Sequence, residues 1–399
     1  MTRRAVTAVI VLSKGSGEID PDTVVLGIPL LRRIVMVALR AGYRDILVAD
    51  DGSFGCAKLL EGTTAVSLAS TRLAGHQCSN RILVLASNIL PHPSLLRYLG
   101  EIPLRVETAY APASGIAAVE TADPAALMSI IGRANDAASL FAELERMYRR
   151  ADSLPDNMRW VTVSNRAELK HAEEWLLRGL IKDTEGFMSR HVERKISLAV
   201  TRRLVRTDIT PNQMTAVSVA VGVVGALFFL SSAPAYQLVG ALLFLLHSIL
   251  DGCDGEIARL KYCESRFGGL LDFWGDNAVH SAVFVCIGLG WWIGDRTLLP
   301  LLLACSATVG GLLSAGFVYR RTMRHKTSEG PLFTSITTSE APSHLSHLAD
   351  ALARRDFIYL VVILSAFGKA HWFLILAAVG APIFFTFVLW NSYREGVQA

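Results

Sequence analysis

Four aspartates lie close together in a stretch that long apolar segments flank on both sides. The stretch is LDGCDGEIARLKYCESRFGGLLDFWGDN, residues 250–277. Asp251 and Asp254 are about one helical turn apart, as are Asp272 and Asp276, so each pair shares one helix face. A break near KYCESRF would let the two helices run antiparallel, so that these faces meet. The spacing therefore predicts that four carboxylates converge in a pocket inside the membrane.

Converging carboxylates need positive charge nearby, because an unpaired charge is costly in a membrane. Hard divalent cations such as Mg²⁺ or Mn²⁺ prefer carboxylate oxygens and would neutralise the cluster. Two such ions side by side are a recurring device of phosphoryl transfer. Gly255, Ala258 and Gly268 leave room for a ligand, and Arg259 offers a guanidinium fork to a phosphate. The pattern favours metal-dependent chemistry on a phosphate, with a polar structural cluster or the ion path of a transporter as alternatives.

The composition changes sharply along the chain, whose 399 residues are enough for two domains. Up to about residue 205 the charged residues are spread throughout, as in a soluble domain. From about residue 213 onward come apolar runs of roughly 20 residues, the length that spans a bilayer. No signal peptide is expected, because MTRRAVTAVIVLSKGSG turns polar early and suits a first β-strand. We predict six spans, the fifth of them short: 213–231, 236–256, 273–294, 297–319, 356–368 and 371–391.

Lysines and arginines gather in the loops on one side of the predicted spans, and this bias sets the orientation. Most of them follow the second and the fourth span: Arg259, Lys261, Arg266, Arg320, Arg321, Arg324, Lys326, Arg354 and Arg355. The loops on the other side carry only Arg296 and Lys369. We therefore predict a multi-pass protein of the cytoplasmic (inner) membrane, with its N-terminal domain and its C-terminus in the cytoplasm. The net charge of +4 follows from this bias and does not indicate nucleic-acid binding.

The first half of the chain alternates strand-like and helix-like segments. AVTAVIVLS, DILVA, RILVLASNIL, LRVETAY and WVTVSN are predicted strands. PLLRRIVMVALRAG is a predicted amphipathic helix that ends at Gly42, a second helix follows Pro124, and RAELKHAEEWLLRGLI forms a third. This alternation predicts a Rossmann-like α/β domain over residues 1–182, followed by an all-α transmembrane domain of six helices over residues 209–399.

Residues 183–208 connect the two domains and have the pattern of an amphipathic helix. Apolar residues recur at helical spacing and cations occupy much of the remaining surface: Met188, Val192, Ile196, Ala199 and Val200 against Arg190, Arg194, Lys195, Arg202 and Arg203. Such a helix suits the membrane interface, with its cations near anionic headgroups or a phosphate-bearing substrate. A plain connector helix is the alternative. Thr210 is the expected N-cap of the first span, with Pro211 at its first helical position.

The aspartate stretch resembles the signature of the CDP-alcohol phosphotransferases, D-x-x-D-G-x-x-A-R-x8-G-x3-D-x3-D. The chain matches every defined position: Asp251, Asp254, Gly255, Ala258, Arg259, Gly268, Asp272 and Asp276. The resemblance covers roughly residues 185–395, including TPNQMT at the entry to the first span. It implies a membrane enzyme, expected to be a homodimer, in which an alcohol displaces CMP from a CDP-linked donor. Its expected place is in phospholipid or polar-lipid biosynthesis.

The resemblance also implies a role for each matched residue. Asp251, Asp254 and Asp272 would be ligands of two Mg²⁺ or Mn²⁺ ions, with Asp251 and Asp272 bridging both. Asp276 would be the general base for the attacking hydroxyl and a ligand of the second ion. The CDP moiety would be bound by Asn212, Thr215, Asp251, Asp254, Gly255, Ala258, Arg259, Ser265 and Gly268. For a phosphate on the acceptor, we expect arginines near the cytoplasmic mouth of the pocket: Arg190, Arg194 and Arg320.

The first half of the chain resembles the nucleotidyltransferase domain of the inositol-1-phosphate cytidylyltransferase/di-inositol-phosphate-phosphate synthase fusions. GIPLLRRIVMVALRAGYRDILVA is similar to the early strand–helix–strand of sugar-nucleotidyltransferases, and SRHVERKIS is similar to the interface helix of the fusions. Those enzymes cradle CTP in a Gly-rich loop followed by Arg and Pro-Lys, whereas LSKGSGEIDPDTVVLGIPL keeps only Gly15 and Gly17. Ser87 and Asn88 stand where a metal-binding Asp would end a central strand. We expect a degenerate domain, kept for structure, regulation or substrate handling.

Three classes of function follow from these features. The intact signature favours a membrane CDP-alcohol phosphotransferase that uses CDP-diacylglycerol or a CDP-polyol. A bifunctional cytidylyltransferase/phosphotransferase would also make its own CDP-alcohol and convert it into a soluble inositol-type phosphodiester, but the altered CTP loop disfavours it. A non-enzymatic transporter or scaffold is the third class.

Overall fold

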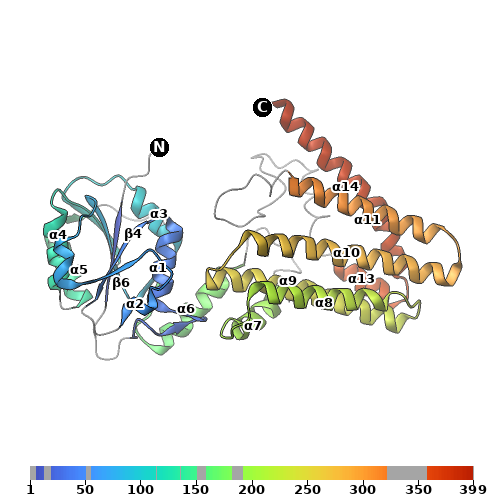
Figure 1. The fold of residues 1–399 in the computed structure, drawn as a ribbon, viewed down its shortest axis with the longest axis horizontal. Helices are drawn as coiled ribbons and strands as arrows, with labels where there is room; N and C mark the ends of the chain where they lie inside the picture. Colours follow the sequence, from blue (N-terminus) through green and yellow to red (C-terminus); the bar gives the residue numbers. More distant parts are fainter. Residues whose placement is uncertain are drawn as a thin grey trace. The chain divides into compact units, whose positions relative to one another are not determined.

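The computed structural model describes residues 6–12, 19–50, 55–113, 115–134, 136–150, 159–181, 192–320 and 357–398. The chain divides into two compact units, Met1–Gly179 and Leu180–Ala399. The first unit is built around a β-sheet, whereas the described elements of the second are helices (Figure 1).

A seven-stranded sheet forms the centre of the first unit (Figure 1). In spatial order its strands are β10 (Arg149–Arg150), β8 (Thr108–Ala113), β9 (Ile116–Glu120), β6 (Arg81–Ala86), β1 (Thr7–Val11), β4 (Asp45–Asp50) and β5 (Val66–Ala69). β1 pairs in parallel with β4 and β6, whereas β9 pairs antiparallel with β6 and β8. The predicted α/β sheet with parallel strands is confirmed. The sheet is mixed. The connection between β8 and β9 is too short to join parallel strands, so these two strands pair antiparallel.

Helices cover both faces of this sheet, with α1 and α3 on one side and α4 and α5 on the other (Figure 1). The helices of the unit are α1 (Leu30–Ala41), α2 (Cys56–Leu59), η1 (Ser70–Gly75), α3 (Pro93–Glu101), α4 (Pro124–Arg133), α5 (Ala137–Met147) and α6 (Arg166–Arg178). Two small strand pairs complete it: β2 (Val24–Val25) with β3 (Ile28–Pro29), and β7 (Ile89–Pro91) with β11 (Trp160–Thr162). α1 ends as predicted, because Gly42 has a φ of 99° and closes the helix in the left-handed conformation.

Two predicted strands differ from the structure. RILVLASNIL is divided into β6 and β7, because the chain turns at Ser87 and Asn88. The Ser87 amide donates to the Val11 carbonyl (2.9 Å), while the Asn88 carbonyl accepts from the Val163 amide (2.7 Å), so the two residues bond to different segments. Only the end of LRVETAY joins β8, because Glu107 has a φ of 61°, which lies outside the β region.

The second unit consists of α7 (Arg194–Leu204), α8 (Pro211–Phe228), α9 (Pro234–Lys261), α10 (Arg266–Asp295), α11 (Leu299–Val318), α13 (Phe357–Ala366) and α14 (Ala370–Gln398). Five of them, α8, α9, α10, α11 and α14, are long and apolar enough to cross a membrane. α13 has 10 residues and is too short by the same measure, although it coincides with the fifth predicted span. The chain is therefore a multi-pass membrane protein with five candidate spans among its described residues.

The turn between α9 and α10 is local in origin. Tyr262 has a φ of 54° and ends α9 in the left-handed conformation. The Ser265 hydroxyl accepts from the Gly268 amide (3.0 Å) and caps α10. Thr210 and Gln213 form a capping box at the start of α8, with Pro211 in the first turn, so the predicted N-cap is confirmed. These signals fix the end of α9 and the starts of α8 and α10.

Glycines set the close approach of α8 and α9. A Cβ on Gly240 would lie 2.7 Å from the Gly225 carbonyl oxygen, and a Cβ on Gly225 would lie 2.8 Å from the Cβ of Leu243. Contacts this short are possible only between small residues, which is a common basis of helix packing in membranes. α10 also packs on α8, so a change in the distance between α8 and α9 would alter the packing of all three helices.

We expect Gly240→Ala to destabilise the second unit, because the added methyl group meets a backbone atom that cannot rotate away. Overpacking of this kind costs about 1–3 kcal/mol. The thermal unfolding midpoint in detergent should fall. Gly311→Ala is the matched control, since a Cβ there meets nothing within 4 Å, and its midpoint should stay the same or rise. Equal midpoints for the two variants would contradict the packing argument.

Candidate functional site

Three of the predicted aspartates converge between α9 and α10. Asp251 and Asp254 on α9 and Asp272 on α10 each offer a carboxylate oxygen, and these three atoms lie within 4.8 Å of one another. Asp251 and Asp254 are 3% and 6% exposed, and Asp272 is half-buried. The structure thus brings Asp272 next to two aspartates that precede it by 21 and 18 positions in the sequence.

The chemistry of this donor set fits a hard divalent cation. All three donors are carboxylate oxygens, the ligands that Mg²⁺ and Mn²⁺ prefer. Three like charges this close repel one another, and their burial removes the water that would screen them. A bound cation would offset both costs. The described residues therefore support a divalent-metal site.

Thr215 and the backbone of α9 hold Asp254 in place. The buried Thr215 hydroxyl on α8 donates a short hydrogen bond to one Asp254 oxygen, and the Gly255 amide donates another to the second oxygen. Thr215 belongs to the NQMT segment expected to contact the CDP moiety, and the structure places it directly on a carboxylate of the cluster. α8 is therefore part of the site.

Two glycines of the signature leave space that other candidate side chains use. A Cβ on Gly255 would lie 3.0 Å from Nη1 of Arg259, and a Cβ on Gly268 would lie 3.0 Å from both Asn212 Oδ1 and Ser265 Oγ. The candidates for CDP binding therefore gather at the N-terminal ends of α8 and α10 and along α9. Ala258, one turn beyond Asp254, is buried on α9.

Asp276 lies one turn further along α10 and faces a histidine. Its Oδ1 is 3.4 Å from Nε2 of His247, a 2% exposed residue of α9. Sequence reasoning missed His247, although its position four residues before Asp251 places it on the same helix face. His247 is a polar residue inside a predicted span, and it lies on the helix face that carries the aspartates. That combination is the sequence signal that identifies it.

A buried carboxylate joins α7 to α9 beside the aspartates. Glu256, which is 0% exposed, accepts hydrogen bonds from Arg194 Nη1 (2.6 Å), Ser197 Oγ (2.7 Å) and Thr201 Oγ1 (2.6 Å). Sequence reasoning missed Glu256 too, since a single acid next to a signature glycine gives no periodic signal. α7 thus packs a polar face on α9, while Val192 and Ile196 are 40% and 44% exposed.

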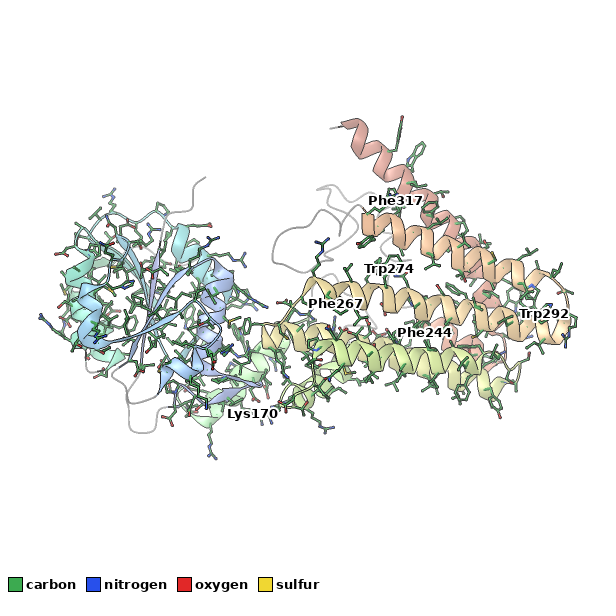
Figure 2. All side chains as sticks on the ribbon, viewed as in Figure 1. Lys170, Phe244, Phe267, Trp274, Trp292 and Phe317 are labelled. Carbon is green, nitrogen blue, oxygen red and sulfur yellow. The ribbon has the colours of Figure 1, made fainter. Side chains whose placement is uncertain are left out.

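The three arginines expected near an acceptor phosphate have different surroundings. Arg194 is bound to Glu256, and Arg190 lies outside the described residues. Arg320 is exposed and follows Tyr319, whose ring packs on Trp274 with centroids 5.9 Å apart. Trp274, labelled in Figure 2, lies between Asp272 and Asp276 in the sequence. The end of α11 is therefore beside the turn of α10 that runs from Asp272 to Asp276, which we call the site turn.

In the first unit, the expected CTP-loop residues Gly15 and Gly17 lie outside the described residues. Ser87 and Asn88 follow β6, as the sequence indicated. The Asn88 side chain donates to the Ser164 hydroxyl (3.3 Å), so its amide is engaged within the unit. Asp50 ends β4, which β1 separates from β6 in the sheet, and is 7% exposed.

Comparison with known proteins locates the family resemblance in the second unit. Residues 208–381 match the family model described as CDP-alcohol phosphatidyltransferase. A "Bifunctional IPC transferase and DIPP synthase" of Thermococcus kodakarensis is 42% identical over 118 residues, which are 29% of this chain and 26% of the relative. The relative of the same name from Rubrobacter xylanophilus is 35% identical over 158 residues, 39% of this chain and 34% of the relative.

A "Phosphatidylinositol phosphate synthase" of Mycobacterium bovis is 32% identical over 126 residues, 31% of this chain and 56% of the relative. The matched regions thus span about a quarter to a third of the bifunctional relatives and about half of the mycobacterial one. The match at residues 208–381 includes every aspartate of the cluster, so the family signature and the observed convergence fall in the same unit.

We expect Glu256→Leu to release α7 from α9, because three donors lose their shared acceptor. Breaking a buried ion pair costs about 3–5 kcal/mol. Trypsin should then cut after Lys195, Arg202 and Arg203 at least about 10-fold faster, as locally opened segments do. The fragments can be followed by mass spectrometry.

Asp208→Asn, at an exposed position between α7 and α8, is the control and should leave the cleavage rate unchanged. If Glu256→Leu and the wild-type protein were cut at the same rate, Glu256 would not be what holds α7 in place.

Proposed function

We propose that this chain, whose residues 208–381 carry a CDP-alcohol phosphatidyltransferase domain, transfers a substituted phosphate from a CDP-linked donor to an alcohol and releases CMP. The observation that carries the proposal is the convergence of Asp251, Asp254 and Asp272 within 4.8 Å, inside the matched region. Buried carboxylates at this distance need a cation, and a cation at a phosphate-binding site serves phosphoryl transfer.

Each aspartate has a distinct part in the proposed reaction. Asp251, Asp254 and Asp272 would hold two divalent ions, Mg²⁺ or Mn²⁺, with Asp276 as a further ligand. Bound ions would screen the donor's diphosphate and stabilise the charge that builds on the transferred phosphorus. Asp276 takes the proton of the acceptor hydroxyl, since a hydroxyl is a weak nucleophile until a positioned base accepts its proton. The new P–O bond forms to the alcohol, and the P–O bond to CMP breaks.

The donor nucleotide would bind along the residues that surround Asp254. Arg259 is the cation that the signature places there, and Gly255 keeps the space beside its guanidinium open. Asn212 Oδ1 and Ser265 Oγ both lie close to Gly268, so two polar groups are available to a ligand at the starts of α8 and α10. Thr215 contributes a hydroxyl already aligned on Asp254, and the small Ala258 lets a ligand approach α9.

The membrane arrangement follows from the same helices. We propose that α13 serves as a sixth crossing element, with the first unit and the C-terminus in the cytoplasm of a cell whose cytoplasmic (inner) membrane holds the protein. The loops rich in Lys and Arg support this orientation. Residues 183–208 would lie at the membrane interface, because exposed Val192 and Ile196 share α7 and its N-terminal turn with cations. A homodimer is proposed from the family resemblance.

CDP-diacylglycerol is the proposed donor and a phosphate-bearing alcohol the proposed acceptor. The name of the mycobacterial relative, a phosphatidylinositol phosphate synthase, supports a phospholipid product. Arg190, Arg194 and Arg320 remain the proposed contacts of the acceptor phosphate. Of these, Arg320 has an exposed side chain beside the site turn of α10.

A second candidate is a bifunctional enzyme that also forms a CDP-alcohol from CTP, as the names of the Thermococcus and Rubrobacter relatives suggest. We propose instead that the first unit, within residues 1–182, is a degenerate nucleotidyltransferase. Asn88 supports this, because it replaces an expected carboxylate and bonds to Ser164.

Asp276→Asn should lower the rate of CMP release by at least about 100-fold, because an amide cannot take the hydroxyl proton. CMP would be measured with Mg²⁺ against CDP-diacylglycerol and CDP-inositol as donors. The acceptors would be glycerol phosphate, inositol phosphate, inositol, serine and a neutral lipid alcohol. Asp295→Asn, at the far end of α10, is the matched control and should retain wild-type turnover.

If the wild-type protein released no CMP with any pair of donor and acceptor, the proposed activity would be contradicted. That result would favour a transporter or scaffold. Full turnover by Asp276→Asn would instead remove Asp276 from the role of base and leave the family assignment untouched.

The full-length protein should release no pyrophosphate from labelled CTP with sugar or polyol phosphates, because the first unit lacks the expected Pro-Lys and a carboxylate at position 88. The measurement is radiometric and uses the Asp276→Asn variant, so that the second unit cannot consume the product. Release of pyrophosphate would establish the bifunctional alternative.

A further inference from the structure

The buried imidazole of His247 lies where three helices of the second unit meet. Its Nδ1 is 2.9 Å from the Ser218 carbonyl oxygen on α8, and its Nε2 is 3.4 Å from Oδ1 of Asp276 on α10. His247 itself belongs to α9. We propose that His247 is a positioning residue, which holds the Asp276 carboxylate in the orientation that the reaction needs. This inference rests on the proposed phosphotransferase function.

The packing around His247 leaves its ring little freedom. The ring of Phe244, labelled in Figure 2, stacks on it with centroids 6.2 Å apart and an interplanar angle of 16°. On the α8 side, a Cβ on Gly222 would lie 2.9 Å from His247 Cγ, so only a glycine admits the ring at this distance. Stacking, close backbone and a hydrogen bond together define one orientation of the imidazole.

The hydrogen bond to Ser218 decides which nitrogen faces Asp276. A carbonyl oxygen accepts hydrogen bonds and does not donate them, so Nδ1 carries a hydrogen. Nε2 is left for the carboxylate. Donation from Nε2 to Oδ1 keeps Asp276 a carboxylate, as its proposed role as base requires.

Asp276 is more exposed than Asp254, so a contact that fixes its direction matters for a catalytic role. Its side chain is 24% exposed, whereas Asp254 is 6% exposed and is already held by Thr215 and the Gly255 amide. A base that also serves as a metal ligand must keep both oxygens in defined directions. Groups behind the ligands of a metal site commonly provide this, and their loss costs about 10- to 100-fold in metal affinity or activity.

The position of His247 in the sequence agrees with this role. His247, Asp251, Asp254 and Ala258 follow one another at helical spacing, so the histidine extends the functional face of α9 by one turn. A buried imidazole in a membrane span is costly unless its polar atoms have partners. Here the partners are a backbone carbonyl and the proposed general base.

Two substitutions of similar size separate positioning from packing. The terminal amide of Gln reaches as far as the Nε2 position of His, whereas the amide of Asn reaches only as far as Nδ1. His247→Asn should therefore lose the contact with Asp276, and His247→Gln should keep it. Binding of Mn²⁺, followed by the electron paramagnetic resonance of the free ion, should weaken about 10- to 100-fold in His247→Asn and stay near wild type in His247→Gln.

CMP release provides the second readout. At saturating Mg²⁺, His247→Asn should lower kcat about 10- to 100-fold with little change in the KM for the donor, and His247→Gln should restore kcat. His371→Asn is the control for loss of a histidine elsewhere in the unit. His371 packs on Trp291, which lies roughly 22 Å further along α10 than Asp276, so both readouts should match wild type.

Failure of the inference and failure of the proposed function have different signatures. If the wild-type protein releases no CMP with any pair, the proposed function fails, and the Mn²⁺ measurement alone decides the role of His247. Equal Mn²⁺ affinities in the Asn and Gln variants overturn the inference, whether both are weakened or both are unchanged. A wild-type protein that binds no Mn²⁺ overturns it as well.

Discussion

Charge in a low-dielectric environment governs the arrangement of the second unit. Asp251, Asp254 and Asp272 lie on long helices made largely of apolar residues, and their oxygens approach within 4.8 Å. Carboxylates placed this way destabilise the fold unless cations or hydrogen-bond donors compensate them. Polar contacts around the site serve three carboxylates: Thr215 donates to Asp254, His247 faces Asp276, and the side chains of α7 donate to Glu256.

Close packing of the helices follows from the same constraint. A donor on one helix reaches a carboxylate on another only when the two backbones approach closely, and glycines permit this at Gly222, Gly240 and Gly268. α8 is therefore as much part of the site as the helices that carry the aspartates. Of these three glycines, Gly268 belongs to the family signature, whereas Gly222 and Gly240 lie outside it, so the site also depends on packing residues that the signature does not include.

The two units differ in how closely their residues match the patterns expected from the sequence. The second unit keeps every defined position of the signature, and the structure brings three of its aspartates within 4.8 Å of one another. The first unit keeps the α/β sheet, yet the residue after Ser87 is an asparagine bonded to Ser164. A sheet with a packed core is stable through burial of apolar residues alone, which is why we propose that the first unit keeps its fold as a degenerate nucleotidyltransferase.

The sequence by itself determined the features that depend on local pattern. Hydrophobic runs placed the long spans, the Thr210–Pro211 pair placed the start of α8, and the spacing of the aspartates placed two of them on each helix. Strand limits such as that of β8 were missed, because one left-handed residue, Glu107, is invisible in a periodic pattern. Only the tertiary structure decided which polar residues meet across helices. His247 reaches Asp276, and Glu256 reaches Arg194, through contacts between residues 29 and 62 positions apart, and no local pattern encodes such distances.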